Sequence, residues 1–250
     1  MSVARDGPRT RLWIRGVGAF CLEGDGRRVG GRPDPGTDPA LFSRVVLDQV
    51  LPRALHLAGI PVLHASAVAG PRGAIVLVGA SGSGKSTLAA LLAMGGWPLL
   101  ADDGVRLESR GRRVLVHPTG GTLRLRETVL PLLGGMAERT LPCPGAPRKR
   151  SLDARGGVLP VAERAVVLHR LFLLGRSRRL SEARPDARES LLSLLVATFR
   201  ADPRDVAAFA RDLPILGTPN LVARVGILRF PPGRRGLEEA LRRILADERC

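Results

Sequence analysis

The stretch from Ala74 to Thr87, AIVLVGASGSGKST, decides the fold of this chain. Its first five residues form an aliphatic run typical of a buried strand, and the residues that follow the glycine-rich segment are apolar at helical spacing. Gly-x4-Gly-Lys-Ser predicts a P-loop, in which backbone N–H groups surround phosphates, the Lys reaches the β- and γ-phosphates and the Ser holds Mg²⁺. We therefore predict a binding site for ATP and Mg²⁺ formed by Gly79, Ala80, Ser81, Gly82, Ser83, Gly84, Lys85, Ser86 and Thr87.

The choice of lysine at position 85 supports this prediction. The chain contains 37 arginines and only two lysines, Lys85 and Lys149, so it uses arginine for most cationic positions. A compact ammonium fits where the wide, planar guanidinium does not. Lysine at position 85 is thus the residue type that a phosphate loop requires.

Length and composition predict one main α/β domain with an N-terminal addition, because 250 residues with 44% hydrophobic residues can bury one sizeable core. We assign a β-hairpin and a helix to residues 1–59 and a P-loop domain to residues 60–250. Cys21, Cys143 and Cys250 are odd in number and lack metal-binding spacing, as expected for thiols of a reducing compartment. No apolar stretch is long enough to span a bilayer, and we expect a cytoplasmic protein without membrane contact.

The formal net charge of +16 comes almost wholly from arginine. It fits an acidic partner, such as a nucleotide, an acidic peptide or nucleic acid, and it fits equally well a bias of genome composition. Tyrosine is absent, and the eight Phe and Trp residues are not interleaved with basic residues. This distribution argues against a base-stacking surface for nucleic acid.

The pattern along the chain predicts the remaining elements. In the N-terminal part we expect a hairpin over 11–29 with its turn at 24–26, a linker over 30–38, and a helix that begins with Asp38 as N-cap and is kinked or split by Pro52. Around the P-loop we expect strands at 61–68 and 97–101 and a hairpin of 105–107 with 114–116. Residues 118–147 read as a mobile loop with a short helix near 128–133. Further strands are expected at 165–174 and 221–230, and helices at 186–199, 203–213 and 237–246.

Two carboxylates extend the prediction from nucleotide binding to chemistry. Asp102 and Asp103 follow the short apolar segment Leu99–Ala101, whose carboxyl end we expect at the same sheet edge as the phosphate loop. One carboxylate can complete the Mg²⁺ shell while the other accepts the proton of a substrate hydroxyl. His64, on the preceding strand, either lies near the phosphates or is a satisfied core histidine.

These residues resemble the HPr kinase/phosphorylase family and its shorter relatives, the stand-alone kinases found beside ribosomally made peptides such as lasso peptides. The resemblance rests on His64 with ASAV, then GASGSGKST, then LLADD, and covers about residues 60–118. It implies a core like that of phosphoenolpyruvate carboxykinase, with a mixed sheet and flanking helices. It also implies phosphorylation of a serine side chain by ATP. The resemblance makes Asp102 the general base, Asp103 a Mg²⁺ ligand and His64 a neighbour of the base. The sequence equally allows the two aspartates to exchange these roles.

Two departures from that family concern the acceptor. The family has Glu after the P-loop Ser and a downstream Glu-Xaa-Arg-Gly stretch, whereas this chain has Thr87 and LRLRE at 123–127. The family's N-terminal domain is missing or reduced to about 60 residues. These differences argue against phosphorolysis and against HPr as substrate.

The favoured function is a kinase acting on Ser or Thr of an acidic peptide or small protein, such as a lasso-type precursor. The residues proposed to hold that acceptor are Arg124, Arg126, Arg148, Lys149 and Arg150. The alternatives are a small-molecule phosphotransferase and an ATP-sensing regulatory protein without catalysis. The sequence does not determine the oligomeric state, and a homo-oligomer is one of the states that it allows.

Overall fold

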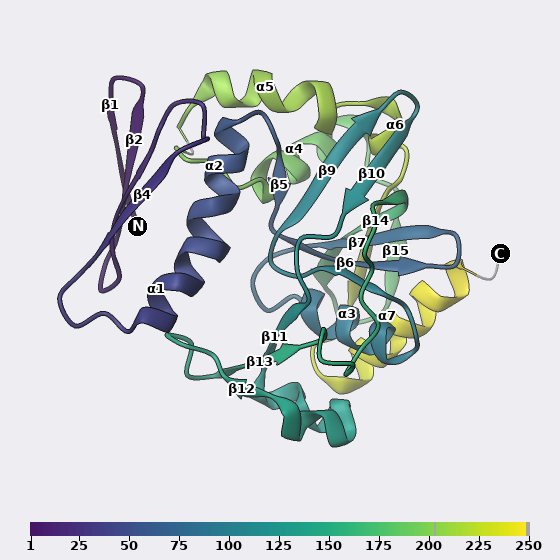
Figure 1. Cartoon of the computed structure of the whole chain (residues 1–250). Helices are drawn as coiled ribbons and strands as arrows, with labels where there is room; N and C mark the ends of the chain where they lie inside the picture. The colour runs from purple at the N-terminus through teal and green to yellow at the C-terminus, as the bar shows by residue number, and fades with distance from the viewer. Residues whose placement is uncertain (203, 249–250) are drawn as a thin grey trace.

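The computed structural model describes residues 1–202 and 204–248, and a nine-stranded mixed sheet forms its centre (Figure 1). Strand β14 (Val166–Arg176) pairs with three other strands, so the sheet branches at this strand. It pairs antiparallel with β10 (Arg113–His117), then parallel with β7 (Gly73–Val78) and with β16 (Val225–Phe230). The other strands are β5 (Val62–Leu63), β6 (Ala65–Gly70), β8 (Leu99–Ala101), β9 (Val105–Arg110) and β15 (Ser181–Ala183). The predicted α/β class, with a mixed sheet and flanking helices, is confirmed.

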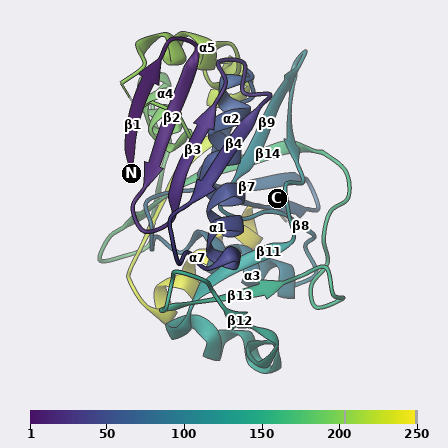
Figure 2. The same ribbon diagram turned by 60° about the vertical axis from the view of Figure 1, so that its left-hand side comes forward.

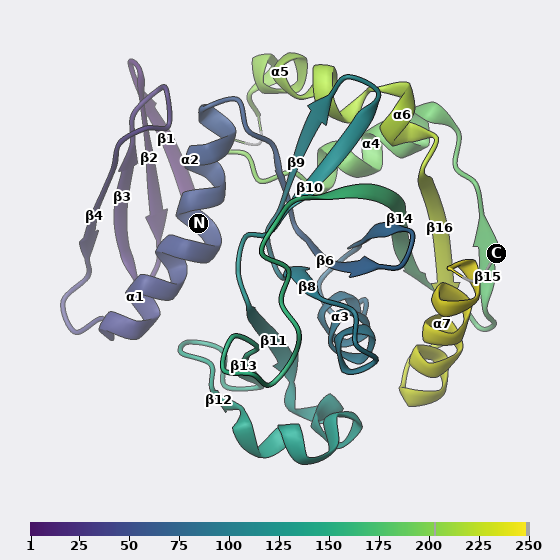
Figure 3. The same cartoon turned by 45° about the vertical axis from the view of Figure 1, so that its right-hand side comes forward.

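Strand β7 is buried on both faces, which explains its unbroken apolar sequence. Ile75 and Leu77 pack on one face, and Ala74, Val76 and Val78 pack on the other. The first face is covered by α3 (Lys85–Met94) and α7 (Arg234–Asp247). The second face is covered by α4 (Ala187–Ala197), α5 (Val206–Leu216) and α6 (Pro219–Val222), as Figure 3 shows. Two helical layers therefore hold the strand that leads into the glycine-rich loop.

The N-terminal residues form a four-stranded antiparallel sheet rather than a single hairpin (Figure 2). Its strands are β1 (Ser2–Asp6), β2 (Arg9–Ile14), β3 (Gly18–Leu22) and β4 (Val29–Pro33). The predicted turn at 24–26 lies between β3 and β4, but β4 occupies part of the predicted linker. Both edge strands are largely exposed, so they lack the alternating pattern by which a half-buried strand is recognised.

A helical segment separates this small sheet from the central one (Figure 1). It consists of α1 (Pro39–Val45), the π-helical turn η1 (Val46–Val50) and α2 (Leu51–Leu57). The Asp38 carboxylate accepts a hydrogen bond from the N–H of Ala40 at 2.8 Å, which confirms the predicted N-cap. Pro52 has no N–H to donate, and the irregular turn lies directly before it, close to the predicted break. Leu12, Phe20 and Leu22 of the small sheet pack against Val45, Val50 and Ala54.

The prediction of a mobile loop over 118–147 is wrong, whereas the short helix predicted near 128–133 lies within a 3₁₀ helix. Here the chain forms a three-stranded sheet of β11 (Thr122–Arg126), β13 (Lys149–Asp153) and β12 (Leu141–Pro142), with a 3₁₀ helix, η2 (Glu127–Arg139), between β11 and β12. Leu123, Leu125 and Leu152 join the core around α3. The alternation Thr-Leu-Arg-Leu-Arg at 122–126 carried this strand signal, and the many Gly and Pro residues that follow obscured it.

The other elements agree with the sequence patterns to within a few residues. The strand predicted at 61–68 is interrupted at His64, whose N–H donates to the Ala197 carbonyl at 2.7 Å. The second predicted helix of the C-terminal part begins at Val206, and α6 precedes β16 where a longer strand was predicted. Strand β15 was not predicted.

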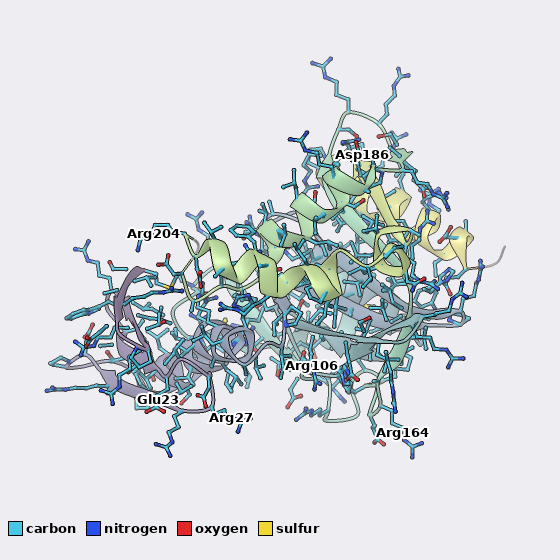
Figure 4. The ribbon with its side chains drawn as sticks, turned by 90° about the horizontal axis from the view of Figure 1, so that it is seen from above. Glu23, Arg27, Arg106, Arg164, Asp186 and Arg204 are labelled. Atoms are coloured by element: carbon cyan, nitrogen blue, oxygen red, sulfur yellow. The ribbon has the colours of Figure 1, made fainter. Side chains whose placement is uncertain are left out.

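Arg27 and Arg164 extend outward at the rim of the molecule in Figure 4. Cys21 and Cys143 are free thiols, whereas Cys250 lies outside the described residues. No helix within 1–202 and 204–248 combines the length and the apolar character needed to cross a bilayer.

Candidate functional site

The loop between β7 and α3 has the backbone that its glycines predict. A Cβ atom on Gly79 would lie 2.8 Å from the Ser83 hydroxyl and 2.9 Å from the Leu174 carbonyl oxygen, so only glycine fits there. Gly84 has φ 105°, a conformation that L side chains rarely adopt, and no side chain caps the N-terminus of α3. The first N–H groups of α3 are thus left for a bound anion, which the helix dipole also favours.

Lys85 lies inside this loop with 5% of its surface exposed. Its ammonium donates to the carbonyl oxygens of Gly79 at 2.9 Å and Ala80 at 3.3 Å. Burial lowers the pKa of Lys85, and the two aspartates oppose that shift. The ammonium is therefore bound to neutral carbonyls, which it can leave for the stronger acceptors of a phosphate.

Asp102 follows β8 and is firmly hydrogen-bonded. One carboxylate oxygen accepts from the Ser66 hydroxyl at 2.5 Å, and the other accepts from the N–H of Arg124 at 3.0 Å. Burial, followed by the charge of Asp103, raises the pKa of Asp102 to about 6, although Ser66, Arg124 and the Ser86 hydroxyl counteract the rise. A carboxyl group with this pKa changes its charge close to neutral pH.

Asp103 has the opposite electrostatic environment. Its φ is 62°, so the chain turns sharply here and the carboxylate meets the guanidinium of Arg124 at 2.7 Å. Burial by itself raises the pKa of Asp103, but Arg124, His64 and Lys149 outweigh that effect and lower it. The environments of the two adjacent aspartates thus push their pKa values apart, as in many acid–base sites.

His64 lines a cavity beside the glycine-rich loop and is only partly buried, so it does not lie inside the core. Its Nδ1 is 3.2 Å from the carbonyl oxygen of Asp103, and its ring meets the ring of Phe199 edge-on at 5.6 Å. Burial and the charge of Lys85 lower the pKa of His64. We expect a neutral imidazole that steadies the turn at Asp103.

Most of the predicted residues line one cavity of about 380 Å³. They come from the glycine-rich loop, the start of α3, the chain just before β6 and just after β8, and the three-stranded sheet: His64, Ser81, Gly82, Gly84, Lys85, Ser86, Thr87, Asp103, Arg124, Arg126 and Lys149. The cavity does not include Gly79, Ala80, Ser83, Asp102, Arg148 and Arg150. We call this space the loop cavity.

Two arginines of the loop cavity were not predicted. Arg176, at the carboxyl end of β14, donates to the Gly82 carbonyl at 2.6 Å, and Arg234 lies at the start of α7. The position of Arg176 after a strand that runs parallel to β7 was the available signal, because such strand ends share one edge of the sheet. The less polar part of the cavity lining consists of Thr128, Val129, Pro131, Leu132 and Leu237.

The five basic residues that were predicted to hold the acceptor do not form one surface. The Arg124 guanidinium bridges Asp103 and Asp48, the latter at 2.5 Å. Arg150 donates to the hydroxyl and the carbonyl oxygen of Thr140 at 3.2 and 2.7 Å. Arg148 lines a different cavity that also contains Arg126 and Lys149. Arg126 and Lys149 line both this cavity and the loop cavity.

Comparison with known proteins includes a distant likeness to a solved structure. No protein-family model matches the chain, and no curated protein matches it. The solved HPr(Ser) kinase/phosphatase from Coxiella burnetii aligns at a TM-score of 0.38 with 13% identity, over 74% of this chain and 95% of that chain. The chain is similar to this protein only remotely. A likeness of this degree assigns neither a family nor an activity.

Proposed function

We propose that this chain is an ATP- and Mg²⁺-dependent kinase that phosphorylates a Ser or Thr hydroxyl of a peptide or small protein. One observation carries the proposal. A buried lysine in a glycine-rich loop and a pair of aspartates with separated pKa values meet at the N-terminus of α3. Phosphoryl transfer needs this combination of a phosphate-binding loop, cation ligands and a base.

The residues present fit a magnesium nucleotide. Lys85 and the uncapped N-terminus of α3 are suited to phosphate oxygens, and Ser86 with Asp103 offers oxygen ligands to Mg²⁺. Within the described part of the chain, no group of three or more His, Cys, Asp or Glu residues is arranged to hold a metal ion. Mg²⁺ would therefore arrive with the phosphates, whose oxygens complete its shell and whose charge it neutralises.

The protein's own residues then have distinct roles. Asp102, with its raised pKa, accepts the proton as the acceptor oxygen bonds to the γ-phosphorus and the bond to the leaving ADP oxygen breaks. Lys85 stabilises the charge on the β- and γ-phosphates, and Arg126 and Arg176 flank the loop at Gly82. His64 keeps Asp103 oriented through its backbone carbonyl.

The acceptor that we propose is a cytoplasmic peptide, for example a lasso-type precursor. In the test, the purified chain and Mg·ATP are incubated in two parallel reactions, one with a Ser-containing precursor peptide and the other with HPr. Mass spectrometry should show a gain of about 80 Da, one phosphate, on the peptide and none on HPr. Labelling of HPr that inorganic phosphate reverses would contradict the peptide proposal, and labelling of neither would favour a small-molecule acceptor.

The nucleotide site is tested separately with Lys85→Ala and Ser86→Ala. The first variant loses the γ-phosphate contact and the second a metal ligand, so we expect Mg·ATP-dependent transfer to fall at least about a hundredfold in each. Ser181→Ala, on the exposed strand β15, is the matched control and should leave transfer unchanged. Undiminished Mg·ATP binding by Lys85→Ala would exclude the loop as the nucleotide site.

A further inference from the structure

A second cavity lies on the other side of the Asp103–Arg124 ion pair. It measures about 360 Å³ and is formed between the segment η1–α2 and the ends of β8 and β11. Asp103 and Arg124 line both this space and the loop cavity, whereas Asp102 lines only the second one. The ion pair is therefore a shared wall, and the proposed base lines the second cavity while Ser86, at the start of α3, hydrogen-bonds to it.

One wall of this second cavity is apolar. Leu47, Leu51 and Leu55 recur every four residues and share one helical face that lines the cavity. Leu47 is 60% exposed and Leu51 is 42% exposed. Another part of the lining, at 119–122, contains Gly120 and Gly121, and the Arg155 side chain lies against Gly121. Leucines left exposed beside a cavity are typical of a surface that a ligand covers.

We propose that this cavity binds the acceptor, with the hydroxyl directed to Asp102 and an adjacent apolar side chain of the peptide resting on the three leucines. This inference rests on the proposed kinase function. In phosphoryl transfer the attacking and leaving oxygens lie in line on opposite sides of the phosphorus. A nucleotide in the loop cavity leaves the second cavity as the approach for the acceptor. There the hydroxyl proton passes to Asp102, the oxygen bonds to the γ-phosphorus, and ADP departs with the electron pair of the broken bond.

The charges of the second cavity determine the chemistry of the segment that it receives. The cavity is lined by three carboxylates, Asp48, Asp102 and Asp103, and by two arginines, Arg124 and Arg155. Arg124 is already engaged by Asp48 and Asp103. No excess of positive charge is left to attract an acidic segment here. We therefore assign apolar residues to the positions next to the acceptor Ser or Thr.

The experiment measures peptide preference and kinetics with defined probes. A Ser-centred peptide array, in which each flanking position is fixed in turn to each amino acid, is phosphorylated with labelled Mg·ATP. We expect Leu, Ile, Val or Met beside the serine to give the strongest labelling. With the best peptide, Leu47→Ser and Leu51→Ser should each raise the acceptor KM about tenfold and change kcat less than about threefold, because one apolar contact is lost.

Two exposed leucines elsewhere provide matched controls. Leu192 on α4 is 51% exposed and Leu213 on α5 is 45% exposed, and neither lines the second cavity. Leu192→Ser and Leu213→Ser should retain the wild-type KM. A wild-type KM in both Leu47→Ser and Leu51→Ser, or an array without apolar preference, would overturn the acceptor-cavity proposal alone. An array without any labelled peptide would overturn the proposed function with it.

Discussion

At the scale of single residues, the site combines a short local motif with side chains that distant segments supply. Lys85, Ser86 and the two aspartates stand in short patterns whose chemistry can be inferred from spacing. Asp48, Arg176 and Arg234 reach the site from segments far away in the sequence, and each is one of many similar residues. In a chain with 37 arginines, composition alone does not indicate which of them meets the loop.

The raised pKa of Asp102 makes a prediction about pH. Because Asp102 must be ionised to accept a proton, and burial raises its pKa to about 6, kcat/KM should fall as the pH drops below about 6. An ordinary carboxyl group would place this fall near pH 4. A pH–rate profile measured between about pH 5 and 9 checks the position of the acidic limb.

Two substitutions assign that limb to its residue. Asp102→Asn keeps the shape but removes the base, so kcat should fall about 10²- to 10⁴-fold while nucleotide binding is retained. Asp103→Asn should instead raise the Mg²⁺ concentration needed for half-maximal rate. Nearly wild-type turnover in both variants would show that the two carboxylates form only a turn.

At the scale of elements, burial decided what could be predicted. β7, the loop and α3 were evident because an aliphatic run buried on both faces leads into glycines and then into helical spacing. β1 and β4 were missed because most of their residues face solvent. The three-stranded sheet was missed because its strands are short and its connection contains Pro131 and the irregular Gly134.

The π-helical turn η1 has a functional consequence at this scale. It carries Asp48, whose burial raises its pKa and whose carboxylate holds Arg124 beside Asp103. In Asp48→Asn one charged partner of Arg124 is lost. We expect kcat to fall about tenfold and the free energy of unfolding to fall by about 1.5–3 kcal/mol, the value of hydrogen bonds to charged groups.

Steady-state kinetics and urea unfolding measure these two effects. Asp6→Asn is the control, because Asp6 forms an exposed pair with Arg11 on the N-terminal sheet. An Asp48→Asn protein with the wild-type kcat and urea midpoint would show that Arg124 keeps its position without the bridge.

At the scale of the whole molecule, the N-terminal sheet and its helices are fastened to the rest by buried polar groups. His56 on α2 contacts Asp212 on α5 at 2.9 Å, and Arg200 contacts the other oxygen of Asp212 at 2.9 Å. Arg5 of β1 also pairs with Asp205. The N-terminal unit that we inferred from sequence is thus attached at several points, including the Asp48–Arg124 contact at the site.

Removing the centre of this network should destabilise the whole chain. Asp212→Ala leaves Arg200 and His56 buried without their carboxylate, at a cost of about 3–5 kcal/mol in the free energy of unfolding. Glu238→Ala, which removes an exposed helical pair with Arg234, should change it by less than about 0.5 kcal/mol. Equal urea midpoints for the two variants would argue against the network as the main attachment.

The branching of β14 also determines how the molecule opens. Leu171, Phe172 and Leu173 pair with β7 on one side and with β16 on the other. Their amides have no edge from which local fraying can begin, so deuterium should enter them only when the entire domain unfolds. Hydrogen-exchange mass spectrometry should find slow labelling there and fast labelling along β1 and β4. The slowest amides of the protein would then lie directly beside the strand that ends in its glycine-rich loop.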